Sequence, residues 1–391
     1  MEQTIKVACG MLLFNLSHGR QLMKRTASAA LFFASCTTVL LVSASPMATD
    51  KAVAVKEAEV HTVMLKKDAL KVALWRESPK GVNARTLKES NVVLFIHGAT
   101  ISGKLSAGYA IEGYSWAQDV AYSGRDAWVV DLPGYGRSDD YPEMRKATPD
   151  ASAESVGNAK SLVPVIDAAV DYVLNVTGAK KLTLIATSRG AIPVGYYLSA
   201  HGDKVDKVVF NSPIVRRDHT DSSIVQGVFG SAERPDKSFY EIPVATRLSM
   251  IEDDRPPGTE TQLEHGFVNN WPRDAALERA HQNNMIKVPG GFAQDIYDAW
   301  QGVYWDPANI KVPVLITRGD YDHVLTTAAD IEWLYAHLSN APSKRYVLID
   351  KGTHAMLFEK KRFELYREVQ VFLDGSSPRL SLTCSFCGGR N

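Results

Sequence analysis

The chain of 391 residues has little cysteine. Two of its four cysteines, Cys9 and Cys36, fall in an N-terminal segment that we expect to be removed from the mature protein. The other two, Cys384 and Cys387, are too few for a disulfide framework, and a structural zinc site would need two further ligands. We therefore expect this C-x-x-C pair to form one small disulfide or to lie in an unstructured tail.

Net charge is also absent. The chain has 44 Lys and Arg residues against 44 Asp and Glu residues, so its charge gives no reason to expect a nucleic-acid partner. It carries no nucleic-acid-binding motif, no internal repeat and no histidines at metal-ligand spacing, so neither a metal nor another cofactor is predicted. With 45% hydrophobic residues, the composition is that of a globular protein with one large domain and an insertion, or with two domains.

Long hydrophobic runs are limited to one N-terminal stretch. Residues 23–25 are Met-Lys-Arg, residues 27–44 carry no charge, and the run ends in small residues of the kind that a signal peptidase reads. The pattern predicts a signal peptide over residues 1–44, with Met23 as an alternative start, and a secreted or periplasmic protein without a stable membrane span. The alternative is a membrane anchor formed by residues 27–44, because a run of about 18 residues reaches the lower limit of spanning length.

Apolar strands and amphipathic helices alternate along most of the remaining chain. Strands are expected over residues 91–96, 126–130, 181–187, 207–210, 312–317 and 345–349. Helices are expected over residues 114–122, 153–176, 190–197, 328–338 and 361–373. Two segments, 59–66 and 69–76, combine alternating and continuously apolar positions, which predicts antiparallel edge strands. The alternation predicts an α/β protein whose mostly parallel central sheet is flanked by helices.

One segment interrupts this alternation. Residues 214–310 contain Pro256-Pro257, short helical patches and many aromatic residues, which is typical of a cap inserted over the ends of the strands. We therefore predict a core formed by residues 45–213 and 311–374, a cap over residues 214–310, and a tail over residues 375–391. Most of the aromatic residues are expected to form the core of the cap, and a few to line a pocket.

The turn after the strand at 181–187 reads Ala186-Thr187-Ser188-Arg189-Gly190. This is a small-x-Ser-x-Gly form of the nucleophile elbow, a sharp strand-to-helix turn that exposes a serine hydroxyl. Its usual first glycine is replaced by Ala186. Taken alone, Ser188 also fits an ordinary helix N-cap, so the other motifs have to decide between the two.

Three more strands end in residues suited to acyl-transfer chemistry. The strand at 91–96 runs into His97-Gly98-Ala99-Thr100, where a backbone N–H freed by the glycine can serve an oxyanion, and where His97 is expected to brace the loop. The last two strands run into Arg318-Gly319-Asp320-Tyr321-Asp322-His323 and Asp350-Lys351-Gly352-Thr353-His354. The carboxyl ends of parallel strands are where an open α/β sheet places its ligand site. The order serine, acid, histidine is one of the known chain orders of a catalytic triad.

Together these motifs resemble the α/β-hydrolase superfamily over about residues 59–373. The resemblance rests on HGAT at 97–100, DLPGYGRS at 131–138, ATSRG at 186–190, and GDYDHV at 319–324 with GTHAMLFE at 352–359. It implies the α/β-hydrolase fold with a helical cap. It also places the catalytic triad at Ser188, Asp322 and His354, with Asp320 as the alternative acid.

The implied activity is that of a secreted serine hydrolase that cleaves a small, partly apolar carboxylic ester, like a carboxylesterase. His354 would activate Ser188, Asp322 would orient His354, and the backbone N–H groups of Ala99 and Arg189 would hold the oxyanion. The predicted substrate-binding residues are Thr100, Trp271 and Trp300. The Arg189 side chain could meet a substrate carboxylate, but pairing with an acid under the cap is favoured. The alternatives are the same triad acting on a lactone, an amide or a carbon–carbon bond, and a hydrolase-like binding protein without activity.

Overall fold

The computed structural model describes residues 54–66, 69–81, 91–252, 255–278 and 284–375. The predicted signal peptide, the alternative anchor at 27–44 and the tail with Cys384 and Cys387 lie outside the described residues. Among the described helices, none combines the length and the apolar character needed to cross a membrane.

The core of the fold is an eight-stranded sheet in the order β1-β2-β4-β3-β5-β6-β9-β10. Its strands are β1 (Glu59–Met64), β2 (Lys71–Glu77), β3 (Val92–Ile96), β4 (Asp126–Asp131), β5 (Leu182–Thr187), β6 (Val205–Asn211), β9 (Val314–Gly319) and β10 (Lys344–Ile349). The six strands β3, β4, β5, β6, β9 and β10 run parallel to one another, and β2 pairs antiparallel with both β1 and β4. The predicted α/β class with a mostly parallel sheet is confirmed.

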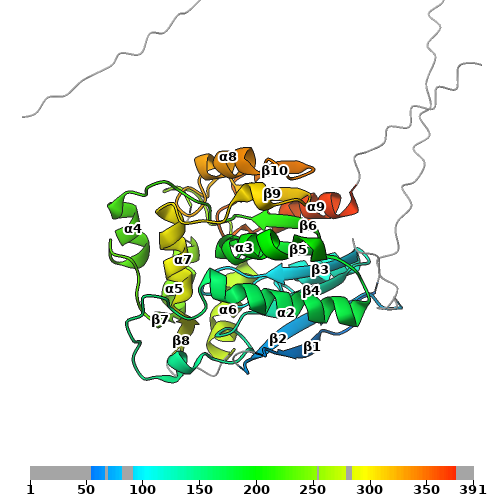
Figure 1. The fold of residues 1–391 in the computed structure, drawn as a ribbon, viewed down its shortest axis with the longest axis horizontal. Coiled ribbons are helices and arrows are strands. Elements are labelled where there is room, and N and C mark those ends of the chain that lie inside the picture. Colours follow the sequence, from blue (N-terminus) through cyan, green and yellow to red (C-terminus); the bar gives the residue numbers. More distant parts are fainter. Residues whose placement is uncertain (1–53, 67–68, 82–90, 253–254, 279–283, 376–391) are drawn as a thin grey trace, which may run out of the picture. The chain divides into compact units, whose positions relative to one another are not determined.

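Helices cover both faces of this sheet (Figure 1). They are α1 (Trp116–Tyr122), α2 (Ala159–Thr177), α3 (Ala191–His201), α8 (Ala328–His337) and α9 (Arg362–Asp374). Alternate residues of β3 belong to two separate hydrophobic clusters: Leu94 packs in the one that includes α2, α3 and α8, and Phe95 in the one that includes α1 and α9. A strand apolar on both faces is thus buried on both faces, as its continuous apolar sequence predicts.

The structure corrects two predicted elements. The strand predicted over 69–76 is not an edge strand, because β2 lies between β1 and β4. Its Arg76 is buried against Asp126 of β4, with Nε–Oδ1 and Nη2–Oδ2 distances of 2.9 and 2.7 Å, so its charge is neutralised inside the fold. The helix predicted over 153–176 begins only at Ala159, where Asn158 caps its first turn.

Between β6 and β9 the chain forms a separate group of elements at one end of the sheet (Figure 1). They are α4 (Ser222–Phe229), β7 (Phe239–Pro243), α5 (Val244–Glu252), α6 (His265–Leu277), β8 (Met285–Pro289) and α7 (Gly291–Trp300). The strands β7 and β8 pair antiparallel in a small sheet of their own, which the sequence analysis did not predict.

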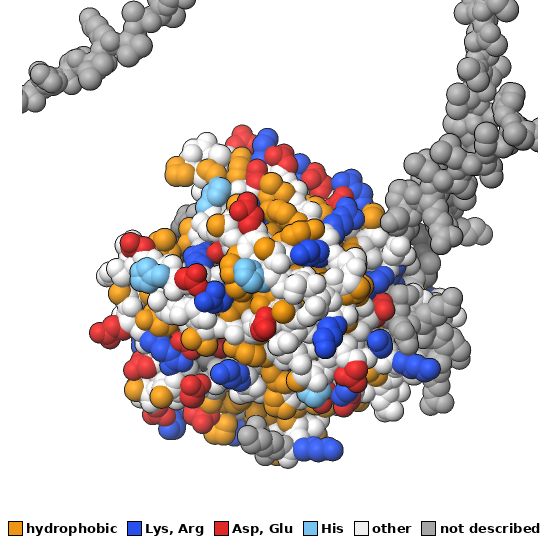
Figure 2. Space-filling model, turned by 45° about the horizontal axis from the view of Figure 1, so that its top comes forward, with side chains coloured by type: hydrophobic (Ala, Val, Ile, Leu, Met, Phe, Trp, Pro, Cys, Tyr) orange, Lys and Arg blue, Asp and Glu red, His pale blue; other side chains and the backbone are white. Residues whose placement is uncertain are grey.

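The surface mixes charges of both signs. On the face shown in Figure 2, basic and acidic side chains are interspersed among apolar ones. This pattern agrees with the zero formal charge of the chain.

Candidate active site

Ser188 lies at the turn between β5 and α3, at the start of a short 3₁₀ turn over Ser188–Gly190. Its φ is +56°, a left-handed conformation that costs a residue other than glycine about 1–3 kcal/mol. The crossing of strand and helix is tight, because a Cβ on Gly190 would lie 2.6 Å from the His97 carbonyl oxygen. The sequence pattern of the elbow therefore corresponds to a strained strand–turn–helix connection that holds the serine in one orientation.

His354 connects Ser188 to Asp322. Its Nε2 lies 2.7 Å from Ser188 Oγ, and its Nδ1 lies 2.7 Å from Asp322 Oδ2. The Asp322 side chain is fully buried, whereas that of His354 is 12% exposed. A carboxylate can only accept a hydrogen bond, so Nδ1 carries the proton and Nε2 is free to accept the serine proton. This arrangement can move a proton from Ser188 Oγ to the imidazole.

The acid loop is held by its own hydrogen bonds. Asp322 Oδ1 accepts from the Thr326 N–H at 2.9 Å, and Arg318 donates to the carbonyl oxygens of Asp322 and Thr326 at 2.5 and 2.7 Å. Asp320, the alternative acid, is held beside β10 through its backbone N–H, and its Oδ1 has no hydrogen-bond partner among the described residues. The carboxylate in contact with His354 is therefore that of Asp322.

The loop after β3 touches the nucleophile. A Cβ on Gly98 would lie 2.9 Å from Ser188 Cβ, so only glycine lets this loop come so close. The next residue, Ala99, has a backbone N–H without an acceptor in the described part of the chain. The N–H of Arg189 belongs to the first turn after β5, where helix N–H groups have no intrahelical partner. Both predicted oxyanion donors thus belong to segments that adjoin Ser188.

His97 braces this loop. Its Nδ1 lies 2.9 Å from the Gly98 carbonyl oxygen, and its Nε2 accepts from the Leu132 N–H at 3.1 Å. Burial lowers the pKa of His97 to about 3, so the ring is neutral at physiological pH. Its two hydrogen bonds are those of a neutral imidazole, which supports the structural role expected for it.

The Arg189 side chain is buried and pairs with Asp295 of α7. Its Nε lies 2.8 Å from Asp295 Oδ2, and its Nη2 contacts the same oxygen. Nη2 also donates to the Gly157 carbonyl oxygen at 2.5 Å. The guanidinium therefore meets an acid from the inserted segment, which is the favoured one of the two roles considered for it.

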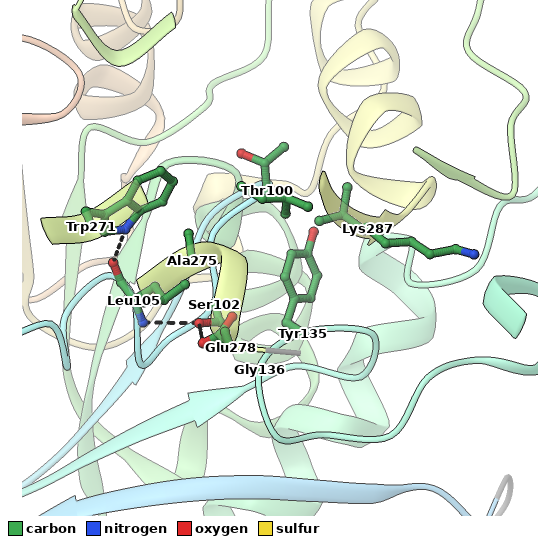
Figure 3. A pocket seen from close by; sticks show the side chains of 11 residues that line it. Thr100, Ser102, Leu105, Tyr135, Gly136, Trp271, Ala275, Glu278 and Lys287 are labelled. Atoms are coloured by element: carbon green, nitrogen blue, oxygen red, sulfur yellow. Dashed lines mark hydrogen bonds between the residues drawn. The ribbon is translucent and has the colours of Figure 1, made fainter. Parts of the chain in front are cut away.

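Two of the three predicted substrate-binding residues line one cavity. Thr100 and Trp271 are among the side chains that line it (Figure 3), and the Trp271 Nε1 donates to the Leu105 carbonyl oxygen at 3.3 Å. The interior leaves about 10 Å³ for the centre of a water molecule, which is room for about one water. The apolar part of its lining comes from Leu105, Tyr135, Trp271, Ala275, Ile286 and Val288.

Trp300 is not among the residues that line this cavity. It is fully buried in the larger hydrophobic cluster, and its ring packs against Phe229 and the Arg217 guanidinium at 6.1 and 4.5 Å. Thr100 and Trp271 therefore line the same cavity, although Trp271 is also fully buried in a hydrophobic cluster, and Trp300 lies in the core away from this cavity.

Two further residues support the loops of the site. Arg247 of α5 donates to Thr100 Oγ1 at 2.6 Å and so joins the inserted segment to the loop of Ala99. Buried Glu359 accepts from the Thr353 hydroxyl at 2.5 Å and from the Thr353 N–H, which fixes the residue before His354. Only Glu359 falls within a quoted motif, GTHAMLFE, so only this one could have been found from the sequence.

No cluster of three or more potential metal ligands occurs among the described residues. Of the groups beside Ser188, His354 can transfer a proton, and the N–H groups of Ala99 and Arg189 can donate hydrogen bonds to a carbonyl oxygen.

A family model described as serine aminopeptidase, S33, matches residues 88–361 of the chain. No curated protein sequence matches the chain at a significant level. Among solved structures, a bromoperoxidase from Bacillus anthracis has a TM-score of 0.55 at 14% identity, and the match covers 81% of this chain and 100% of that one.

Two further structures are similar. A thermophilic esterase from Thermogutta terrifontis has a TM-score of 0.51 at 14% identity, with 81% of this chain and 98% of that one covered. An epoxide hydrolase from Vigna radiata has a TM-score of 0.53 at 17% identity, with 82% and 98% covered. At such low identities the likeness shows the fold alone.

Proposed function

The chain belongs to the α/β-hydrolase superfamily, because it matches the family described as serine aminopeptidase, S33. We propose that it is a serine hydrolase that cleaves a carboxylic ester. The observation that carries the proposal is the hydrogen-bonded series Ser188–His354–Asp322, with both contacts at 2.7 Å. The esterases among the structurally similar proteins support the ester as substrate.

In the first half of the reaction, His354 Nε2 takes the proton of Ser188 as Oγ bonds to the carbonyl carbon of the ester. Asp322 stabilises the imidazolium that forms. The N–H groups of Ala99 and Arg189 hold the negative carbonyl oxygen, and losing one such donor typically costs about 10²–10³ in rate. The imidazolium then gives its proton to the leaving oxygen, the carbon–oxygen bond breaks, and an alcohol departs from the acyl-enzyme.

In the second half, a water molecule attacks the acyl-enzyme while His354 takes one of its protons. The tetrahedral intermediate uses the same two N–H donors. When it collapses, the proton returns to Ser188 Oγ, and the carboxylic acid leaves. The net reaction consumes one ester and one water and restores the enzyme, so no cofactor enters the balance.

Cleavage of an amide is the second candidate, because the matching family model is described as a serine aminopeptidase. The same triad can act on both bonds, and turnover separates them. We expect a short-chain p-nitrophenyl ester to be hydrolysed at least about 100-fold faster, by kcat/KM, than amino-acid p-nitroanilides. Faster cleavage of the anilides would assign the amide instead.

The Ser188→Ala variant serves as the control for both substrates. It should fold as the wild type does and lose turnover by several orders of magnitude, because the nucleophile is absent. A folded wild type that turns over neither class of substrate would favour the binding-protein alternative.

We also propose that the protein is exported, on the sequence pattern of residues 23–44 alone. The intact mass of the protein recovered from its native host is expected to match a chain that begins after about Ala44. A mass that retains residues 27–44, together with recovery in the membrane fraction, would assign the anchor instead.

A further inference from the structure

The backbone and the side chain of Arg189 serve the site in two different ways. Its backbone N–H is a proposed oxyanion donor, and its side chain, 1% exposed, is inserted between α7 and the loop before α2. Because one residue carries both groups, whatever fixes the guanidinium also restrains the peptide that follows Ser188. The ion pair with Asp295 and the hydrogen bond to the Gly157 carbonyl oxygen fix it, and of the two only the ion pair can be removed by a side-chain substitution.

Asp295 is itself held firmly. Its Oδ1 accepts from the N–H of Ala159, the first residue of α2, at 2.9 Å, and its Oδ2 meets Arg189. The start of α7 packs directly on the start of α2, since a Cβ on Gly291 would lie 2.2 Å from the Asn158 nitrogen. The neighbouring Gln294 accepts from the Ser155 N–H at 2.8 Å. The carboxylate therefore offers Arg189 a fixed point.

A buried ion pair of this kind adds little net stability, because desolvation of two charges offsets their attraction. Its geometry, in contrast, is strictly defined, and removing one partner leaves an uncompensated charge inside. An oxyanion hole depends on donors that are placed before the charge develops. A pair that contributes little to stability can thus contribute to catalysis by fixing the position of an N–H group.

We propose that Asp295 is a positioning residue, which acts through the Arg189 side chain to aim the Arg189 N–H at the oxyanion. The inference rests on the proposed function, since it assumes an acyl-transfer reaction at Ser188. Under this proposal helix α7 of the inserted segment helps to position the oxyanion donor, so removing the inserted segment would disturb the oxyanion hole.

The chain offers two matched controls. On the same helix, Asp298 pairs with Arg234, with Nε–Oδ1 and Nη2–Oδ2 distances of 2.7 Å each. Arg234 also donates to the Ala153 carbonyl oxygen, so this pair is not joined to the turn that carries Ser188. Asp126 forms a pair of similar burial with Arg76, at the first residue of β4. Parallel strands present their first residues at the sheet edge opposite to the one that carries Ser188.

The test compares Asp295→Asn with Asp298→Asn and Asp126→Asn. For each we would measure the urea midpoint, kcat and KM for a p-nitrophenyl ester, and inhibition by a trifluoromethyl ketone, whose adduct with serine carries an oxyanion. Asp295→Asn is expected to lower kcat about 10- to 100-fold with KM changed less than about threefold, and to weaken the inhibitor in parallel. The two controls should keep kcat within about threefold whatever their loss of stability.

An unchanged kcat in Asp295→Asn, or an equal fall in the controls, would overturn the inference. If Asp295→Asn does not fold, Asp295→Glu takes its place, because the charge stays and the carboxylate moves by one methylene. A smaller fall of kcat with weaker ketone inhibition is then expected, and wild-type values for both would refute the inference.

The proposed function fails on a different result. A wild type that hydrolyses no ester, or an active Ser188→Ala variant, would refute the serine hydrolase. A wild type whose activity disappears in Ser188→Ala but persists unchanged in Asp295→Asn would refute only the role of Asp295.

Discussion

Replacing Asp322 by asparagine would exchange one carboxylate oxygen for an NH₂ group, and the two contacts of the carboxylate determine where that group lies. Asp322 Oδ1 accepts from the Thr326 N–H at 2.9 Å, and Oδ2 faces His354 Nδ1 at 2.7 Å. In Asp322→Asn the amide oxygen has to face the Thr326 donor, which leaves the amide NH₂ toward His354. The NH₂ group can only donate, so Nδ1 must become the acceptor and the ring proton moves to Nε2.

With a proton on Nε2, His354 donates to Ser188 Oγ and can no longer take its proton. The equivalent change in a serine protease triad lowers kcat by about 10⁴ through this tautomer, and we expect a loss of similar size. Asp320→Asn, whose carboxylate is not the one in contact with His354, should keep kcat within about tenfold.

Both variants would be assayed with a p-nitrophenyl ester, and their folding checked by circular dichroism. A loss of less than about tenfold in Asp322→Asn would refute the assignment of the tautomer. A larger loss in Asp320→Asn than in Asp322→Asn would move the acid to Asp320.

Three further predictions concern the loops around the site. Gly98→Ala should lower kcat about 10- to 100-fold in the ester assay with little change in KM. The new Cβ would lie 2.9 Å from Ser188 Cβ and would push the loop that carries the Ala99 N–H away from the nucleophile. An unchanged kcat would contradict this. The pKa of His97 is lowered to about 3 in the folded state, so as the pH falls the unfolded chain binds a proton before the folded protein does. The contribution of neutral His97 to the free energy of unfolding is therefore fully present above about pH 6.5, and the free energy should fall by up to about 5 kcal/mol toward pH 3. Urea unfolding at several pH values should show this loss, and His97→Asn should reduce its slope; an equal slope would place the titration elsewhere. Glu359→Gln should lower kcat about tenfold, since the carboxylate that fixes Thr353 becomes a weaker acceptor; retained kcat would limit Glu359 to a role in stability.

The parallel strands of the fold could be predicted from the sequence because their signal is local. A strand such as β3 is apolar at every position, and its burial on both faces follows from that pattern alone. The elbow could be predicted for a related reason, since the close approach of strand and helix requires Gly190 at a fixed distance from Ser188.

The features that the sequence analysis missed depend on contacts between distant segments. β2 lies inside the sheet because it pairs with β4, a distant strand in which Asp126 meets Arg76. The β7–β8 pair joins strands separated by two helices. The acid that meets Arg189 is Asp295, more than a hundred residues away, and nothing near either residue marks the pair. Pairing across such separations is decided by the folded chain as a whole, so local periodicity cannot predict it.

The central claim is that Ser188 is an activated nucleophile. The most direct measurement treats the folded protein with a fluorophosphonate probe and maps the adduct by peptide mass spectrometry. We predict one adduct, on Ser188, that forms on the folded wild type and is lost on the urea-unfolded chain and in His354→Ala. A folded wild type that stays unlabelled, or an adduct on another serine, would contradict the account.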